Sequence, residues 1–403
     1  MDSRTAWVAK RIPAMALAAF SLAASASGFQ LLEQNASGLG NAYAGSAAVA
    51  EDASTVYFNP AGMTRLQRAE LSAGAAVIRP SYRYSNADSQ TGVLSGNGGD
   101  AGAPAVLPNA YGSYAVRPNL YLGLGIGAPF GLKTEYDNPW SGAAQSVKFD
   151  VKTVNLNPSV AWRASENWAF GAGVNYQKID IDYVRAVSVA AAPYAASTAR
   201  FKADDTGTGW NVGVLFAASP AMRVGMSYRS SVSYTVTGDL TVTGPVPALN
   251  AAGSSTAHAN VKLPSTFILS VVQKLDDRWE MLGDLSRTQW SSIRQVDIER
   301  SSGPASGQVA QSLQADFRDT WRLAFGGTYL INDVWRYRFG IAYDQSPVKG
   351  ADQRLVSLPD NDRLWFSSGV QWQPRPGARL DLGRAYLYIR PAAIHNDQRA
   401  AAP

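Results

Sequence analysis

The feature that most constrains this chain is a strict alternation of apolar with small or polar side chains, repeated in segments of about ten residues. In Trp168–Tyr176, WAFGAGVNY, the even positions are apolar and the odd positions hold Ala, Gly and Asn. This period predicts strands with one apolar face. Hydrophobic residues make up 46% of the chain. Beyond the N-terminal leader, however, no stretch approaches the ~20 apolar residues of a membrane helix.

The alternating segments are typical of strands that cross a lipid bilayer. Their apolar faces begin and end on aromatic residues, as in Trp168/Tyr176 and Trp335/Tyr343, which suits the two interfacial girdles of a membrane barrel. There are about thirteen such segments. Some are joined by very short turns and others by long loops, as in bacterial outer-membrane proteins. In lipid, strands are viable only in a closed barrel. The sequence therefore predicts an all-β, transmembrane, antiparallel β-barrel, with a soluble β-sandwich as the alternative.

The N-terminus has the pattern of an export signal. Three basic residues precede the apolar core Ala14–Leu22, and Ala24-Ser25-Ala26 supplies a small-residue cleavage site. A transmembrane anchor is the alternative, but the core is too short to cross ~30 Å of hydrocarbon. We therefore expect a cleaved signal peptide over residues 1–26 and a mature chain in the outer membrane.

Composition excludes several classes of function. There is no cysteine, so no disulfide framework is expected. The net charge is +5, of which the leader contributes +2, and the remaining +3 is too weak and dispersed for a nucleic-acid-binding protein. The two histidines, His258 and His395, have no cysteine or paired carboxylates beside them. Asp360-Asn361-Asp362 lacks the later Glu of a calcium loop. We expect no catalytic site, no metal and no cofactor.

Residues 27–66 do not alternate and are rich in Gly and Ala, but they carry Phe29, Leu31, Tyr43 and other apolar side chains. A disordered periplasmic tail is one interpretation, although this apolar content argues against it. The better interpretation is a plug inside the barrel, called here the hatch. Asn59-Pro60-Ala61 would form the corner at which the hatch leads into the first strand.

Several ungapped blocks make the sequence resemble the FadL-type long-chain fatty-acid transporters of the outer membrane. The resemblance implies a fourteen-stranded barrel with an N-terminal hatch, a hydrophobic ligand site in the lumen and a sideways opening where the third strand is kinked. It also implies passive uptake of a ligand that leaves lipopolysaccharide surroundings. The blocks are GFQLLEQNASGLGNAYAG, EDASTVYFNPAGMTRL, PFGLKTEYDNPWSG, FRDTWRLAFGGTYLINDVWRYRFGIAYDQSPV and SLPDNDRLWFSSGVQW.

The third strand is interrupted at Ala128-Pro129-Phe130-Gly131. Proline lacks a ladder donor and glycine often marks a bulge, so pairing should fail here. An ordinary strand end near the outer rim is the alternative. The resemblance implies that the lateral opening lies at this kink.

The segment after Gln177 changes phase: Ile179, Ile181 and Tyr183 are apolar, and charged residues lie between them. If the strand continues without a bulge, these three side chains point inward and form an apolar wall suited to an acyl chain. A bulge after Gln177 would remove this inference. With Phe29 and Phe130, these are the expected ligand-binding residues.

The resemblance places Arg185 where a basic side chain meets the ligand's head group. The family's second basic position corresponds to Leu313, which is a departure, and Arg318 would substitute only if the register shifts. Neutral ligands therefore stay open. The expected function is passive uptake of long-chain fatty acids by a monomer folded by the barrel assembly machinery. Import of aromatic or alkane hydrocarbons, or a non-transporting structural barrel if the chain is truncated, are the alternatives.

The C-terminal part departs from an intact barrel. Residues 67–390 are expected to form the barrel and 391–403 an irregular tail in place of a closing strand. Thirteen strands would leave two edges unpaired in lipid. Arg384 also falls on an apolar face, where an arginine near the midplane costs about 2–4 kcal/mol. A truncated chain and a miscounted strand are the two explanations.

Overall fold

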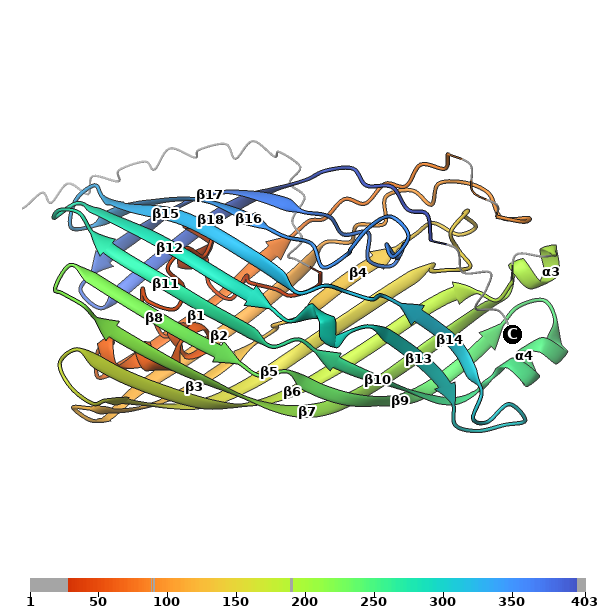
Figure 1. Ribbon diagram of the computed structural model, residues 1–403, viewed down its shortest axis with the longest axis horizontal. Helices are drawn as coiled ribbons and strands as arrows, with labels where there is room; N and C mark the ends of the chain where they lie inside the picture. The colour runs from red at the N-terminus through yellow and green to blue at the C-terminus, as the bar shows by residue number, and fades with distance from the viewer. Residues whose placement is uncertain (1–27, 88, 90, 189–190, 397–403) are drawn as a thin grey trace, which may run out of the picture.

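The computed structural model describes residues 28–396, except 88, 90, 189 and 190. The predicted leader therefore lies outside the described residues, as does the end of the tail. Long antiparallel strands wrap into an elongated barrel, with short turns at one end and the longer loops at the other (Figure 1). The end with the longer loops is extracellular in outer-membrane barrels. Of the described helices, none is both long and apolar enough to cross a membrane.

The secondary structure of the described residues is dominated by strands. The strands are β1 (Ala69–Ile78), β2 (Ala105–Arg117), β3 (Leu120–Gly127), β4 (Gly131–Glu135), β5 (Lys148–Arg163), β6 (Trp168–Ala186), β7 (Thr198–Ala217), β8 (Met222–Arg229), β9 (Val232–Thr243), β10 (Ser255–Leu263), β11 (Thr266–Lys274), β12 (Trp279–Thr288), β13 (Gln295–Arg300), β14 (Val309–Gln314), β15 (Thr320–Leu330), β16 (Trp335–Asp344), β17 (Arg363–Arg375) and β18 (Ala378–Ile389). The helices are α1 (Ala36–Gly40), α2 (Thr55–Phe58), η1 (Pro60–Arg65), α3 (Ala192–Ala195), α4 (Pro247–Gly253) and η2 (Trp290–Ser292).

In several places, two consecutive strands lie end to end and together cross the barrel wall once. Five consecutive pairs do so: β3/β4, β8/β9, β10/β11, β12/β13 and β14/β15. The eighteen strands minus these five give thirteen passes. With thirteen antiparallel passes, β1 and β18 run in the same direction. No ladder pairing joins these two strands within the part of the chain that the structure describes.

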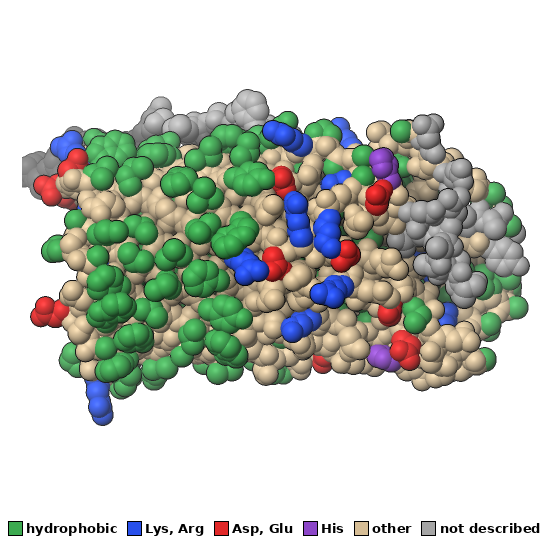
Figure 2. Space-filling view, viewed as in Figure 1, with side chains coloured by type: hydrophobic (Ala, Val, Ile, Leu, Met, Phe, Trp, Pro, Cys, Tyr) green, Lys and Arg blue, Asp and Glu red, His purple; other side chains and the backbone are tan. Residues whose placement is uncertain are grey.

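The alternation read from the sequence separates an outer from an inner face. Apolar side chains form a belt around the half of the barrel that carries the short turns (Figure 2). Arg384 is an exception, because its exposed side chain lies on the outer face between Leu382 and Tyr386. Outward apolar residues with more than a third of their surface exposed include Leu122, Leu124, Ile126, Trp168, Phe170, Val174, Tyr176, Trp321, Leu323, Phe325, Tyr337 and Ile341.

Residues 28–66 are enclosed by the strands. Helix α1 packs against β16, β17 and β18, and η1 packs against β3, β5, β6 and β7. Two inward glycines show how closely the segment approaches the wall: a Cβ at Gly225 would overlap the backbone of Ala47, and one at Gly340 would overlap that of Asn41. Small residues on both sides therefore allow backbone to lie against backbone.

The three residues of the corner Asn59-Pro60-Ala61 are buried, and both polar atoms of the Asn59 side chain are hydrogen-bonded. The Asn59 amide nitrogen donates to the carbonyl oxygens of Ala47 (2.7 Å) and Val214 (3.0 Å). Its amide oxygen accepts from the Ala61 N–H at 3.1 Å, and Pro60 begins η1. Asn59 thus caps η1 and ties the corner to β7, immediately before the chain enters β1.

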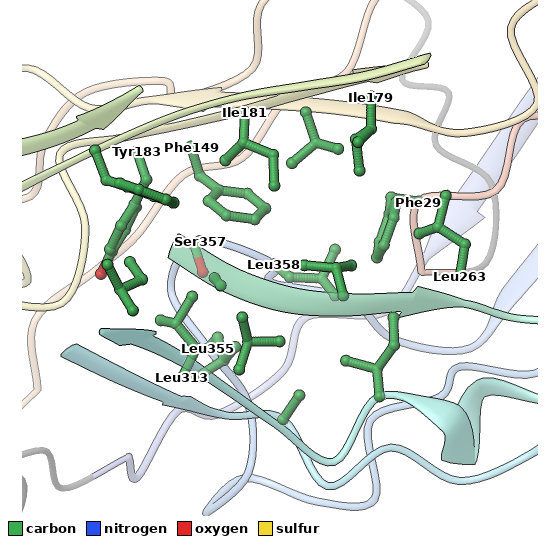
Figure 3. Close-up of a pocket in the computed structure, with 18 of the residues that line it drawn as sticks. Phe29, Phe149, Ile179, Ile181, Tyr183, Leu263, Leu313, Leu355, Ser357 and Leu358 are labelled. Carbon is green, nitrogen blue, oxygen red and sulfur yellow. The ribbon is translucent and has the colours of Figure 1, made fainter. Parts of the chain in front are cut away.

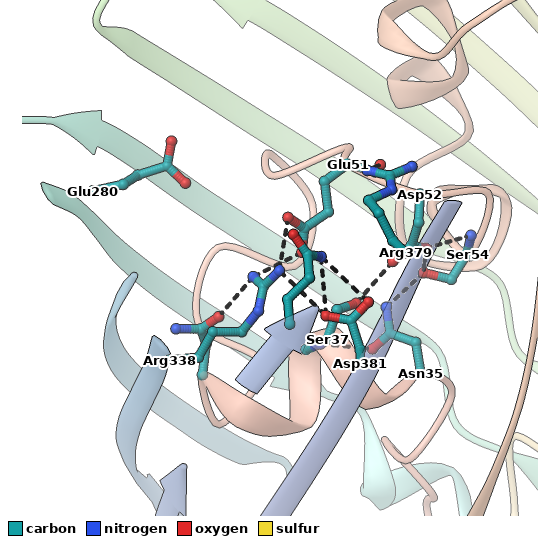
Figure 4. Close-up of polar contacts among 12 residues, drawn as sticks. Asn35, Ser37, Glu51, Asp52, Ser54, Glu280, Arg338, Arg379 and Asp381 are labelled. Carbon is teal, nitrogen blue, oxygen red and sulfur yellow. Dashed lines mark hydrogen bonds and ion pairs between the residues drawn. The ribbon is translucent and has the colours of Figure 1, made fainter. Parts of the chain in front are cut away.

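Charged groups hold the other side of the enclosed segment to the wall (Figure 4). Arg338 on β16 pairs with Glu51 of the segment at 2.8 Å and with Asp381 on β18 at 3.5 Å. Arg379 on β18 bonds the Glu51 carbonyl oxygen and pairs with Glu70 on β1. These contacts link β16, β18 and β1 through the enclosed segment.

The described part of the predicted tail lies against the loop between β16 and β17. The His395 N–H donates to the Ala351 carbonyl oxygen at 2.9 Å, and Arg354 bonds the Ala393 carbonyl oxygen. Residues 390–396 form neither strand nor helix.

Candidate functional site

An apolar cavity of about 80 Å³ lies inside the extracellular half of the barrel (Figure 3). Apart from the Ser357 hydroxyl and the Tyr183 phenol, its lining side chains carry no polar atom. Such a surface offers contact to hydrocarbon and few hydrogen bonds. The lining comprises Phe29, Phe149, Val151, Ile179, Ile181, Tyr183, Phe201, Ala259, Val261, Leu263, Ile293, Val296, Ile298, Leu313, Ala315, Phe317, Leu355, Ser357 and Leu358.

Strand β6 supplies three of these residues from one face. Its pairing with β7 continues from Trp168 to Ala186 without a shift, so there is no bulge after Gln177. The inner face is therefore continuous, and Ile179, Ile181 and Tyr183 all point into the cavity (Figure 3). The Tyr183 hydroxyl donates to the Gln145 carbonyl oxygen, which turns its only polar atom away from an occupant.

Phe29 closes the cavity on the side of the enclosed segment. Its ring centroid lies 5.0 Å from that of Trp290 and 5.9 Å from that of Phe130. Phe130 is buried in the same apolar cluster but stands behind Phe29 rather than in the lining. The Phe29 ring thus connects the cavity lining to the kink of the third strand.

The kink is a one-residue bulge between β3 and β4. Pairing with β5 ends at Gly127 opposite Asn155 and resumes at Gly131 opposite Lys152, so three residues face two. The Thr153 hydroxyl bonds both the N–H and the carbonyl oxygen of Phe130, at 2.9 and 2.7 Å. The Thr153 N–H also donates to the Phe130 carbonyl oxygen at 3.1 Å, so Thr153 of β5 bonds both backbone groups of Phe130.

The N-terminal segment pairs with this bulge from inside. The Leu31 N–H donates to the Pro129 carbonyl oxygen, and the Gly131 N–H donates to the Phe29 carbonyl oxygen, both at 2.8 Å. The Gln34 side chain donates to the Ala128 carbonyl oxygen at 2.9 Å. All four residues of the predicted kink are therefore next to the first residues of the described chain.

The other edge of the kinked strand is largely unpaired. The ladder between β2 and β3 ends at Ala110 opposite Ile126. Beyond that point, the ladder of β2 is with β1 along its other edge, and the ladder of β4 is with β5 along its other edge. Among the described residues, no ladder joins β2 to β4. Near this break lie a bridge between Gly102 and Thr134, a hydrogen bond from the Glu135 N–H to the Ala101 carbonyl oxygen at 3.0 Å, and the bridge between Gln30 and Phe130 on the inside. The wall therefore has an interrupted ladder beside the cavity.

Buried Glu33 lies a few residues further along the enclosed segment. Burial raises the pKa of its carboxyl group to about 7, against the opposing effect of its backbone hydrogen bond and of Arg363 and Arg322.

Arg185 lies at the extracellular end of the inner face of β6, beyond Tyr183. Its guanidinium donates to the carbonyl oxygens of Ala186 and Ala310, both at 3.1 Å, and makes no ion pair among the described residues. Leu313 lines the cavity. Arg318 does not substitute, because it pairs with Asp362 at 3.7 Å and bonds the Ser346 carbonyl oxygen instead.

A basic residue that sequence reasoning missed is Arg300. It follows the cavity-lining Ile298 on the inner face of β13 and donates to the Gly253 carbonyl oxygen (2.6 Å) and the Ser255 hydroxyl (3.1 Å). It lies close enough to Arg185 for the two charges to repel. The alternation Ile298-Glu299-Arg300 predicts that Arg300 shares the inner face with Ile298. The proximity of Arg300 to Arg185 could not be predicted, because it depends on how the strands assemble into a barrel.

The cavity wall contributed by β10 was also missed. Ala257, Ala259, Val261 and Leu263 alternate with polar residues, which is the inverse of the lipid-facing pattern. A strand that is apolar inside and polar outside indicates a greasy lumen above the membrane level. This signal was present in the sequence.

Comparisons with known proteins agree on one family. A family model described as outer membrane protein transport protein (OMPP1/FadL/TodX) matches residues 17–403. The chain is 31% identical to the long-chain fatty acid transport protein of Escherichia coli O6:H1, over 96% of this chain and 93% of that protein. It is 32% identical to outer membrane protein P1 of Haemophilus influenzae, over 90% and 86%.

Solved structures show the same fold. A FadL homologue from Pseudomonas aeruginosa superimposes with a TM-score of 0.77 at 24% identity, covering 90% of this chain and 92% of that one. The toluene transporter TodX of P. putida gives 0.64 at 15% identity, covering 83% and 87%.

Proposed function

Since this chain belongs to the OMPP1/FadL/TodX family of outer-membrane transport proteins, we propose that it takes up long-chain fatty acids by passive diffusion. Curated relatives are named long-chain fatty acid transport proteins. In the proposal, the acyl chain occupies the apolar cavity and leaves sideways through the barrel wall. Residues 28–66 act as the hatch that closes the lumen to water.

The observation that carries this proposal is the position of the apolar cavity beside the interrupted ladder. Phe29 lines the cavity, and its ring packs against Phe130 of the kink. An occupant that displaces Phe29 would reach a place where β2 and β4 share no ladder, so no row of backbone hydrogen bonds has to break. A hydrophobic ligand could then enter the bilayer without crossing water.

The ligand's carboxylate is assigned to Arg185, with Arg300 as a second base. Both guanidiniums donate only to neutral acceptors among the described residues. Each keeps its charge without a carboxylate partner near the end of an otherwise apolar cavity. A carboxylate placed there would gain charge-assisted hydrogen bonds.

A second candidate, import of neutral aromatic or alkane hydrocarbons, rests on a specific observation. The position of the family's second base is Leu313, and the cavity itself has no charged lining residue. A neutral hydrocarbon would fill it without needing either arginine. Structures with the same fold include the monoaromatic hydrocarbon channel CymD and the toluene transporter TodX.

The test is uptake by cells that lack their own transporter and carry this protein or a cavity-filling variant. Ala259 is buried in the cavity wall on β10, and the next residue, Asn260, is exposed on the outer face. Ala259→Phe should lower oleate uptake at least several-fold, because the added ring takes space from the acyl chain. Asn260→Phe is the matched control and should leave uptake unchanged.

Uptake is measured with radiolabelled oleate and, in parallel, with a labelled alkane. Selective loss of oleate uptake in Ala259→Phe, with a folded barrel, supports the fatty-acid function. Loss of alkane uptake alone supports the second candidate. Unchanged uptake of both ligands would reject the cavity as the route.

A further inference from the structure

A group of basic side chains lies on the outer surface at the extracellular edge of the apolar belt (Figure 2). Arg318 is half-buried, with 39% of its side-chain surface exposed, and the other members are exposed. We call this group the basic band. It consists of Lys262, Arg287, Arg294, Arg318, Lys349 and Arg390.

The basic band lies at the height of lipid headgroups. Arg287 follows Leu285 on the outer face of β12, and its guanidinium lies 5.8 Å from the ring centroid of exposed Trp321. Arg390 follows exposed Tyr388 in the same way at the end of β18. Aromatic residues mark the membrane interface. Charges directly beyond them therefore meet the polar part of the outer leaflet.

The basic band carries excess positive charge. Asp316, Asp319 and Asp362 lie within it and pair with Lys349 (2.6 Å), Arg287 (2.7 Å) and Arg318 (3.7 Å), respectively. Six bases minus three acids leave a charge of +3.

Three members of the basic band carry this excess. Lys262, Arg294 and Arg390 form no ion pair within the part of the chain that the structure describes. Their exposed cationic groups are therefore available to an anion from outside.

The opposite side of the barrel is built differently at this level. There, most outward bases of β4–β7 are matched by carboxylates on the same or the neighbouring strand. The pairs are Lys133–Glu135, Lys148–Asp182, Lys152–Asp150, Lys178–Asp180 and Arg200–Asp182. The excess charge is therefore a feature of the side formed by β10 to β18.

We propose that the basic band binds the phosphate groups of a phosphorylated glycolipid headgroup of the lipopolysaccharide kind in the outer leaflet. Lys262, Arg294 and Arg390 supply the free charges, and the acyl chains of that lipid lie on the apolar belt below. Guanidinium groups match phosphate oxygens with paired, charge-assisted hydrogen bonds. At the membrane surface such contacts are less screened than in bulk water. This inference does not depend on what the cavity carries.

The experiment compares lipid binding by the full chain and a charge-reversed variant. The purified protein in neutral detergent is titrated with lipid A carrying two phosphates and with the dephosphorylated lipid, and binding is followed by native mass spectrometry. The variant is K262E/R294E/R390E, with K262Q/R294Q/R390Q as a milder version. The control K274E/R278E/R375E reverses three exposed bases at the short-turn end. Heat-modified mobility in gels verifies that each barrel is folded.

Wild-type protein should bind the phosphorylated lipid about tenfold more tightly or better, because each base near an anionic surface adds to the attraction. The reversed variant should lose this preference, the glutamine variant should lose part of it, and the control should keep it. Equal binding of the two lipids by wild type, or an equal loss in the control, overturns the proposal. Displacement by inorganic phosphate at matched ionic strength also overturns it, because the site would then bind free anions.

Discussion

Arg185 is the residue whose surroundings bear most directly on ligand choice. Its guanidinium is held by two backbone carbonyl oxygens, which fix its position without neutralising its charge. The cavity below it offers only hydrocarbon contacts apart from one hydroxyl and one phenol. A fatty acid would use both features, whereas an alkane would use only the cavity. One substitution can therefore separate the two candidate functions.

We expect Arg185→Met to lower oleate uptake about tenfold, because a hydrogen bond to a charged group contributes about 1.5–3 kcal/mol. Alkane uptake should be unaffected. The control is Arg200→Met on the neighbouring strand, whose arginine is exposed and pairs with Asp182 on the outer face. Uptake of both labelled ligands is compared in the same cells. Equal loss of oleate and alkane uptake would contradict a head-group role for Arg185.

At the scale of elements, the third strand shows how one extra residue changes the barrel wall. Three residues of the bulge face two of β5, and the chain then follows β5 while the ladder to β2 has ended. The enclosed segment supplies hydrogen bonds to the bulge from the inside. The bulge thus combines a wall defect with a contact to the residue that closes the cavity.

Deletion of Pro129 should restore a regular register, since two residues would then face two. We expect the continuous strand to hinder lateral exit and to reduce oleate uptake at least several-fold. Pro129→Ala keeps the number of residues in the bulge and should behave like wild type. Uptake is measured alongside heat-modified mobility, which reports barrel folding. Wild-type uptake by the deletion variant would rule out exit through this kink.

At the scale of the whole molecule, the proposed hatch role predicts that the enclosed segment keeps the barrel from being an open pore. Its apolar side chains form one cluster with inward residues of the wall. The ion pair of Arg338 on β16 with Glu51, the hydrogen bond of Arg379 on β18 to the Glu51 carbonyl oxygen and the bonds of Asn59 hold it at two sides. Its removal should leave a water-accessible channel.

Deletion of residues 27–58, with the leader and barrel retained, should raise single-channel conductance in planar bilayers from near zero to a porin-like value. Oleate-specific uptake should disappear, since Phe29 and the contacts at the kink are lost. Removal of residues 87–96 serves as the control. The flanking residues Asn86 and Asn97 are joined by a hydrogen bond of 3.2 Å, so the deletion has a short gap to close. A deletion variant that inserts but stays non-conducting would contradict the role of the segment as a hatch.

Local pattern was enough to predict much of this molecule. The alternation in Trp168–Tyr176 predicted the lipid-facing side of β6, and the change of phase after Gln177 predicted that Ile179, Ile181 and Tyr183 point inward. Side-chain direction in a strand depends only on the parity of its residues, so no distant contact is needed. The family resemblance was equally readable from the sequence.

Other features depended on how distant strands come together. The contact of Phe29 with Trp290, the proximity of Arg300 to Arg185 and the hydrogen bond of Leu31 to Pro129 each join parts of the chain that are far apart in sequence. The same holds for the unpaired charges of the basic band. Their positions are set by strand register and barrel curvature, which are collective properties, because each strand's height depends on all of its neighbours. Alternation determines which face a residue occupies, but only the assembled barrel determines which distant residues it contacts there.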